Sequence, residues 1–162
     1  MGRTHYCYLI FIHDALIKKR YLHMGKVFHK GSRESQLLSR IESSKEYERR
    51  NAISRVRDIS ETLANAITSK LIETGYVETH NQNGLEEMIH KCLEDLTRAD
   101  DFDVDYSVAP FRGITTTPNI VSLYVTAFVI EKVINHKDTV DVYGSDEEIY
   151  VCINRQVTKY LS

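Results

Sequence analysis

The sequence predicts an all-α protein that folds as a compact bundle of four to five helices. Two prolines and seven glycines among 162 residues leave few points at which a helix must end. With 42% hydrophobic residues, the chain has enough apolar side chains to bury a core. Several long segments carry these apolar residues at steps of three and four, which is the period of an amphipathic helix.

The clearest expected element is a helix over residues 44–74. Ser43 and Glu46 match a capping box, in which a serine hydroxyl and a glutamate three residues later satisfy free amides at a helix start. Gly75 follows the expected end of the helix, as helix-terminating glycines do. Its apolar residues form one stripe over about five turns: Ile53, Val56, Ile59, Leu63, Ile67 and Leu71.

A separate, shorter helix is expected just before it, from Ser32 to Ile41, with Leu37, Leu38 and Ile41 on one face. Further along, Asn83 with Glu86 predicts the start of another amphipathic helix after a polar loop.

A short β-ribbon can accompany the helices, and two sources for its strands stay open. Residues 101–106 alternate aspartate with Phe102, Val104 and Tyr106, which favours an extended segment. The other source is the pair of short segments that begin at Val77 and Val140.

The segment Ile120–Ile134 is apolar almost all round, which predicts a buried central helix. Its many β-branched residues leave a strand as the alternative. Thr117 is expected as the N-cap, with Pro118 in the first helical position.

A second capping box, Ser145 with Glu148, predicts a last helix that runs to the C-terminus. The two halves of the chain also resemble each other, which suggests two pseudo-repeated helix–loop–helix hairpins. Val77-Glu78 corresponds to Val140-Asp141, and each pair precedes a polar loop and an amphipathic helix. In the helices, Met88, Cys92 and Leu96 correspond to Ile149, Ile153 and Val157.

We expect three parts along the chain. Residues 1–23 form a leader without a coherent amphipathic pattern, and Met24 is a candidate natural start preceded by such an upstream extension. The alternative is an ordinary N-terminal strand or helix that packs Leu9, Ile10 and Ile12. Residues 24–44 form a basic N-terminal segment with the short helix, and residues 45–162 form the helical domain.

Three widely spaced cysteines, Cys7, Cys92 and Cys152, fit neither an even disulfide framework nor a Cys-x-x-Cys zinc site. We therefore expect reduced, buried thiols and a cytoplasmic protein. The apolar segments near the N-terminus and after Asn119 are too short to span a bilayer, so no membrane association is expected.

The charges are segregated along the chain. Residues 18–57 carry twelve basic and four acidic side chains, a net charge of +8, and residues from 58 onward carry a net charge of −10. This asymmetry suggests nucleic-acid contact through the segment Lys26–Arg57. The candidate contacts at the start of the long helix are Lys45, Arg49, Arg50, Arg55 and Arg57. Mutual attraction of the two oppositely charged blocks is the alternative explanation.

A metal-dependent enzyme, with one half of its metal site in each chain, is a second alternative. Glu87 and His90 form a Glu-x-x-His pair, which places a carboxylate and an imidazole on one helix face, as in di-iron carboxylate bundles. The second pair would come from another copy of the chain in a dimer, with Glu61, Glu73 or Glu131 as further ligands.

The sequence contains no Gly-x-Ser-x-Gly elbow and no glycine-rich phosphate loop. We therefore expect a non-enzymatic interaction module without a cofactor, a homo-oligomer that self-associates through the Ile53–Leu71 stripe and can bind a protein partner.

Overall fold

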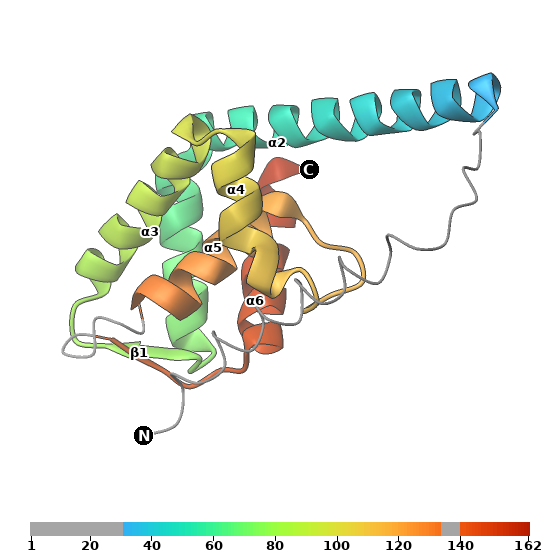
Figure 1. Cartoon of the computed structure of the whole chain (residues 1–162). Coiled ribbons are helices and arrows are strands. Elements are labelled where there is room, and N and C mark those ends of the chain that lie inside the picture. The colour runs from blue at the N-terminus through green and yellow to red at the C-terminus, as the bar shows by residue number, and fades with distance from the viewer. Residues whose placement is uncertain (1–30, 134–139) are drawn as a thin grey trace. The chain divides into compact units, whose positions relative to one another are not determined.

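A computed structural model describes residues 31–133 and 140–162 of the chain. The chain divides into two units, residues 1–41 and 42–162. Within the described part, five α-helices and a two-stranded sheet confirm the all-α class (Figure 1). The elements are α2 (Ser32–Glu73), β1 (Val77–Thr79), α3 (Gln82–Arg98), α4 (Asp101–Val108), the short 3-10 helix η2 (Ala109–Phe111), α5 (Ile120–Phe128), the π-helix η3 (Val129–Val133), β2 (Val140–Val142) and α6 (Asp146–Leu161).

Helix α2 is continuous over 42 residues, so the expected break between a short helix and a long one is wrong. The predicted cap, Ser43 with Glu46, lies inside α2 instead of starting a helix. No glycine or proline interrupts residues 32–73. Adding a turn to an existing helix costs far less free energy than nucleating a second one, so the cap pattern alone does not break α2.

The end of α2 confirms the glycine signal. Gly75 has a φ of 71°, in the left-handed region that glycine adopts without strain. The amide of Tyr76 donates to the carbonyl of Leu71 at 3.1 Å, and the amide of Gly75 donates to Ile72 at 3.0 Å. This pair of hydrogen bonds is the Schellman motif, which satisfies carbonyls left free at a helix end.

The core of residues 42–162 is built around α5, which packs against α3, α4 and α6. In Figure 1, α5 lies among these three helices, with the ribbon at one end of the bundle. The expected central helix over Ile120–Ile134 is thus confirmed against the strand alternative up to Val133, because α5 continues directly into η3. Ile134 itself falls outside the described residues.

The predicted β-ribbon forms from the Val77 and Val140 segments. Strands β1 and β2 pair antiparallel, with Val77 opposite Val142 and Thr79 opposite Val140. Each strand has the same order of burial, beginning with a buried valine. The ladder continues where the amide of Tyr143 donates to Tyr76 at 2.9 Å.

Corresponding positions in the helices of the two halves are also buried to a similar degree. The paired positions Cys92 and Ile153 are both buried, as are Leu96 and Val157. Met88 is half-buried where Ile149 is fully buried. These matches support two pseudo-repeated helix–strand–helix halves joined through the ribbon.

Two helix starts differ from their expected positions. The N-cap of α3 is Asn81, whose side chain accepts from the amide of Gly84 at 2.9 Å, in place of Asn83. The N-cap of α5 is Asn119, whose Oδ1 accepts from Val121 and Ser122, in place of Thr117. In both cases an asparagine near the expected start makes the cap, since its side-chain oxygen can reach amides inside the first turn.

The expected strand over residues 101–106 is wrong, because these residues form α4. The side chain of Asp100 caps the helix by accepting from the amide of Asp103 at 2.8 Å. The buried residues are Val104 and Val108, four positions apart, whereas Phe102 and Tyr106 are exposed. Alternation in the sequence therefore did not correspond to alternation in burial.

The start of α6 is confirmed as a capping box. The hydroxyl of Ser145 accepts from the amide of Glu148, and the Glu148 carboxylate accepts from the Ser145 amide at 2.9 Å. None of the described helices is both long and apolar enough to cross a membrane. The expected leader, residues 1–23, and the candidate start at Met24 lie outside the described residues.

Candidate functional site

Two of the predicted nucleic-acid contacts bind acidic side chains of the same chain. Nη1 of Arg49 donates to Asp105 at 3.0 Å, and its Nη2 donates to the main-chain oxygen of Asp101 at 3.2 Å. Arg50 donates to Asp101 at 3.2 Å and to Glu46 at 2.8 Å. These arginines hold α4 against α2, as the alternative explanation of the charge asymmetry expects.

The three other predicted contacts lie apart from this ion-pair network. Lys45 and Arg57 are exposed on α2, and Nη2 of Arg55 lies 3.4 Å from the main-chain oxygen of Ser162. Five cations that are all free would be expected of a phosphate-binding face. Because Arg49 and Arg50 already pair with acidic side chains, only Lys45, Arg55 and Arg57 remain of the five. Nucleic-acid contact therefore stays a prediction that depends on these three residues.

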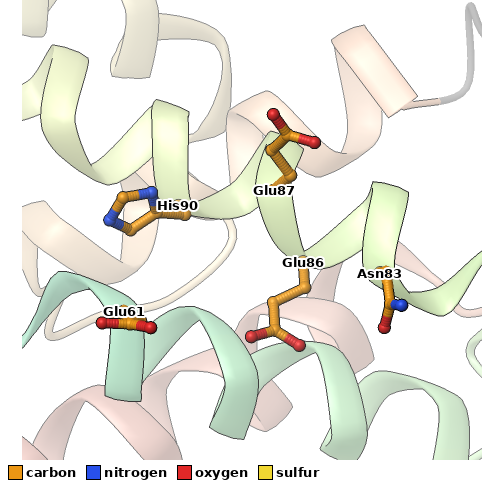
Figure 2. Close-up of a pocket in the computed structure, with 5 residues that line it drawn as sticks. All are labelled: Glu61, Asn83, Glu86, Glu87 and His90. Atoms are coloured by element: carbon orange, nitrogen blue, oxygen red, sulfur yellow. The ribbon is translucent and has the colours of Figure 1, made fainter.

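The metal candidates line a shallow pocket of about 270 Å³ between α2 and α3. Its residues are Glu61, Asn83, Glu86, Glu87 and His90 (Figure 2). In Figure 2, Glu87 points away from Glu61 and from the His90 ring, while Glu86 points toward α2. Glu86 accepts a hydrogen bond from Asn65 at 3.0 Å.

This arrangement does not form a complete metal site. Nowhere in residues 31–133 and 140–162 do three histidine, cysteine, aspartate or glutamate side chains come together as metal ligands. Of the further ligands considered, Glu61 lines the same pocket, whereas Glu73 pairs with Lys70 at 3.0 Å and Glu131 lines a different pocket. A half-site completed by a second copy therefore stays a hypothesis.

His90 makes one contact that the sequence did not suggest. Its Nε2 lies 3.2 Å from the hydroxyl of Ser60 on α2. A serine beside a histidine is half of a nucleophile–base arrangement, which also needs a group that orients the imidazole. In the part of the chain that the structure describes, no carboxylate hydrogen-bonds to His90. The Ser60–His90 contact joins α2 to α3.

The two described cysteines are free thiols in buried positions. Burial raises the pKa of the Cys92 thiol, and the nearby charge of Asp95 raises it further. Burial also raises the pKa of Cys152, against smaller opposing effects of Thr74, Lys70 and Arg155. Since the thiolate is the reactive form, neither cysteine resembles an activated nucleophile.

The apolar stripe expected to mediate self-association is used inside the chain. Val56, Leu63, Ile67 and Leu71 have no exposed surface, and Ile53 and Ile59 pack against the same core. The stripe therefore holds α2 to the rest of the bundle.

A different apolar surface is exposed at the N-terminal end of α2. Leu37, Leu38 and Ile41 are 60%, 40% and 43% exposed. The sequence placed these three residues on one helix face, but sequence periodicity alone does not reveal whether a face is covered. A second exposed pair, Phe102 and Tyr106 on α4, was not identified because the segment was expected to be a strand.

No protein-family model, curated protein or solved structure matches this chain.

Proposed function

We propose that the protein is a non-enzymatic interaction module that self-associates through the N-terminal end of α2. The observation that carries the proposal is the exposed apolar cluster of Leu37, Leu38 and Ile41, which we call the α2 cluster. Its members occupy neighbouring turns of one helix face, at spacings of one, three and four residues. Every described side chain from Arg33 to Lys45 is exposed around them.

The free energy available at this surface explains why self-association is favoured. Removing apolar surface from water contributes roughly 25 cal/mol per Å², and the α2 cluster exposes large parts of three aliphatic side chains. A helical segment whose side chains are all exposed also gains little from tertiary packing, which supplies most helix stability in proteins. Contact with a second copy would bury the apolar surface of the α2 cluster and would also give this segment of the helix packing partners.

The proposal includes a reducing, cytoplasmic location. Cys92 and Cys152 are buried free thiols with raised pKa values, and unpaired cysteines persist where thiols are kept reduced.

Sedimentation velocity over a wide range of protein concentration tests the proposal. We expect a monomer–oligomer equilibrium that shifts with concentration, and at least tenfold weaker association in the triple variant Leu37→Ser, Leu38→Ser, Ile41→Ser. The matched control is Phe102→Ser with Tyr106→Ser, which removes the other exposed apolar pair and should leave association unchanged. A strict monomer at all concentrations would contradict self-association. Loss of association only in the control variant would indicate that the contact lies on α4.

A further inference from the structure

Two residues of the α2 cluster, Leu38 and Ile41, lie within a stripe of four residues that extends over about three turns of α2. Glu34, Leu38, Ile41 and Lys45 follow one another at steps of four, three and four within α2. At 3.6 residues per turn, these positions fall within an arc of about 60° on one face of the helix. The stripe therefore has an acidic end, an apolar centre and a basic end.

Such a stripe is complementary to itself when a second copy runs in the opposite direction. We infer that two copies of the chain pair their α2 helices antiparallel along this stripe. Each Leu38 then lies beside Ile41 of the second copy, and each Glu34 lies beside Lys45 of the second copy. The inference rests on the proposed self-association and specifies its geometry.

Charge decides between the antiparallel and the parallel arrangement. A parallel pair would place Glu34 beside Glu34 of the second copy and Lys45 beside Lys45, which is repulsive at both ends. An antiparallel pair places opposite charges together at both ends. Like charges brought together across an interface oppose association, whereas complementary charges fix its register.

The two charged residues are available for this contact. In the described part of the chain, neither Glu34 nor Lys45 forms an ion pair. Beyond Lys45, the arginines at positions 49 and 50 are already paired with α4 and Glu46. The stripe thus ends where α2 begins to make contacts within its own chain.

Cysteine cross-linking tests the direction and register, in a Cys7→Ser background that leaves only the buried thiols of Cys92 and Cys152. Proteins carrying Glu34→Cys and Lys45→Cys are mixed and mildly oxidised. The mixture should form a disulfide between the two proteins, because each new cysteine lies beside the other. Either protein alone should form little, since two residues at position 34 would lie about 16 Å apart along the axis.

Each other outcome of the cross-linking overturns a defined part of the argument. Cross-links in Glu34→Cys alone would indicate parallel pairing and overturn the inferred geometry, while self-association would stand. A protein that sediments as a dimer but forms no cross-link in any combination makes its contact elsewhere. A protein that stays monomeric overturns the proposed function and this inference together.

Charge reversal provides a second test that leaves the apolar centre intact. Glu34→Lys alone places like charges together at both ends, and so does Lys45→Glu alone, so each should associate at least tenfold more weakly. A mixture of the two should associate as tightly as the original chain, because each end again holds opposite charges. Arg40→Glu is the control for Lys45→Glu, since it makes the same charge change outside the stripe and should leave association within about twofold. If the mixture does not recover, or the control weakens equally, the stripe is not the contact.

Discussion

The two ends of helix α2 have similar apolar spacing and opposite environments. In the C-terminal part, Leu63, Ile67 and Leu71 have no exposed surface. In the N-terminal part, Leu38 and Ile41 are 40% and 43% exposed. Both groups lie on one continuous helix, so local helical structure is the same for each.

The comparison separates helix formation from burial. A period of three to four residues is enough to place side chains on one face of a helix. Whether that face contributes to folding or stays available for a partner depends on what packs against it. The exposed part of α2 gives way to the packed part near Arg49 and Arg50, where the ion pairs with α4 begin.

The largest expected effect comes from truncating one leucine in each part of α2. Leu63→Ala removes a fully buried side chain, and we expect it to lower the free energy of unfolding by about 2–5 kcal/mol. Leu38→Ala should change the unfolding free energy of the monomer by less than about 0.5 kcal/mol while weakening self-association. Urea denaturation at low protein concentration measures the first effect, and sedimentation measures the second. Equal destabilisation of the monomer by both variants would contradict the distinction.

The end of the buried part is sensitive to the residue at position 75. Gly75→Ala places a side chain in the left-handed region at a φ of 71°, and we expect a loss of about 1–2 kcal/mol in unfolding free energy. No atom lies within 4 Å of the added Cβ, so the effect would report backbone strain without a steric clash. Gly113→Ala is a suitable control, because its Cβ also meets open space and its φ is not positive. Similar losses in both variants would argue against the strain.

Two identical cap patterns differ in position, and a matched pair of substitutions measures the difference. Ser145→Ala removes the hydroxyl that caps α6, with an expected loss of about 1 kcal/mol. Ser43→Ala lies inside α2 on its exposed part, so we expect a change of less than about 0.5 kcal/mol. Thermal or urea unfolding of both variants checks the contrast. A large loss for Ser43→Ala would mean that a helix does begin near residue 44.

The link between α2 and α4 should contribute less. A double-mutant cycle with Arg49→Ala and Asp105→Ala should give a coupling of about 0.5–1 kcal/mol, because the pair is 3.0 Å apart and about half of the Asp105 side chain is exposed. The coupling should fall as salt concentration rises. A cycle between Lys45 and Asp105, which form no pair, is the control and should give no coupling. Salt-independent coupling would contradict an electrostatic origin.

The smallest expected effect is on the titration of the α6 cap. The backbone amide of Ser145, and then its hydroxyl, lower the pKa of Glu148. The resulting stabilisation is fully present above the ordinary glutamate pKa of the unfolded chain and is lost as pH falls through the lowered pKa. An NMR titration should show the lowered pKa, with a smaller shift in Ser145→Ala because the amide remains. An ordinary pKa in the original chain would contradict the cap.

Local patterns determined much of the fold. The ribbon formed from the Val77 and Val140 segments, one of the two sources that the sequence left open. The apolar periodicity from Ile53 to Leu71 and the capping box at Ser145 were predicted, and the structure confirms both. Each of these signals depends on residues within a few positions of one another, so the chain itself contains the required information.

Tertiary structure decided what the sequence pattern left open or misplaced. Residues 101–108 became a helix whose Val104 and Val108 reach the core and whose aspartates meet Arg49 and Arg50. Arg49 and Arg50, predicted to contact nucleic acid, pair instead with aspartates of α4. The Ile53–Leu71 stripe, predicted to mediate self-association, packs instead in the core of its own chain. The partners of the two arginines lie more than fifty positions away in the sequence, and the stripe packs into a core formed with other helices. Burial and ion pairing are properties of neighbours in space that local periodicity does not specify.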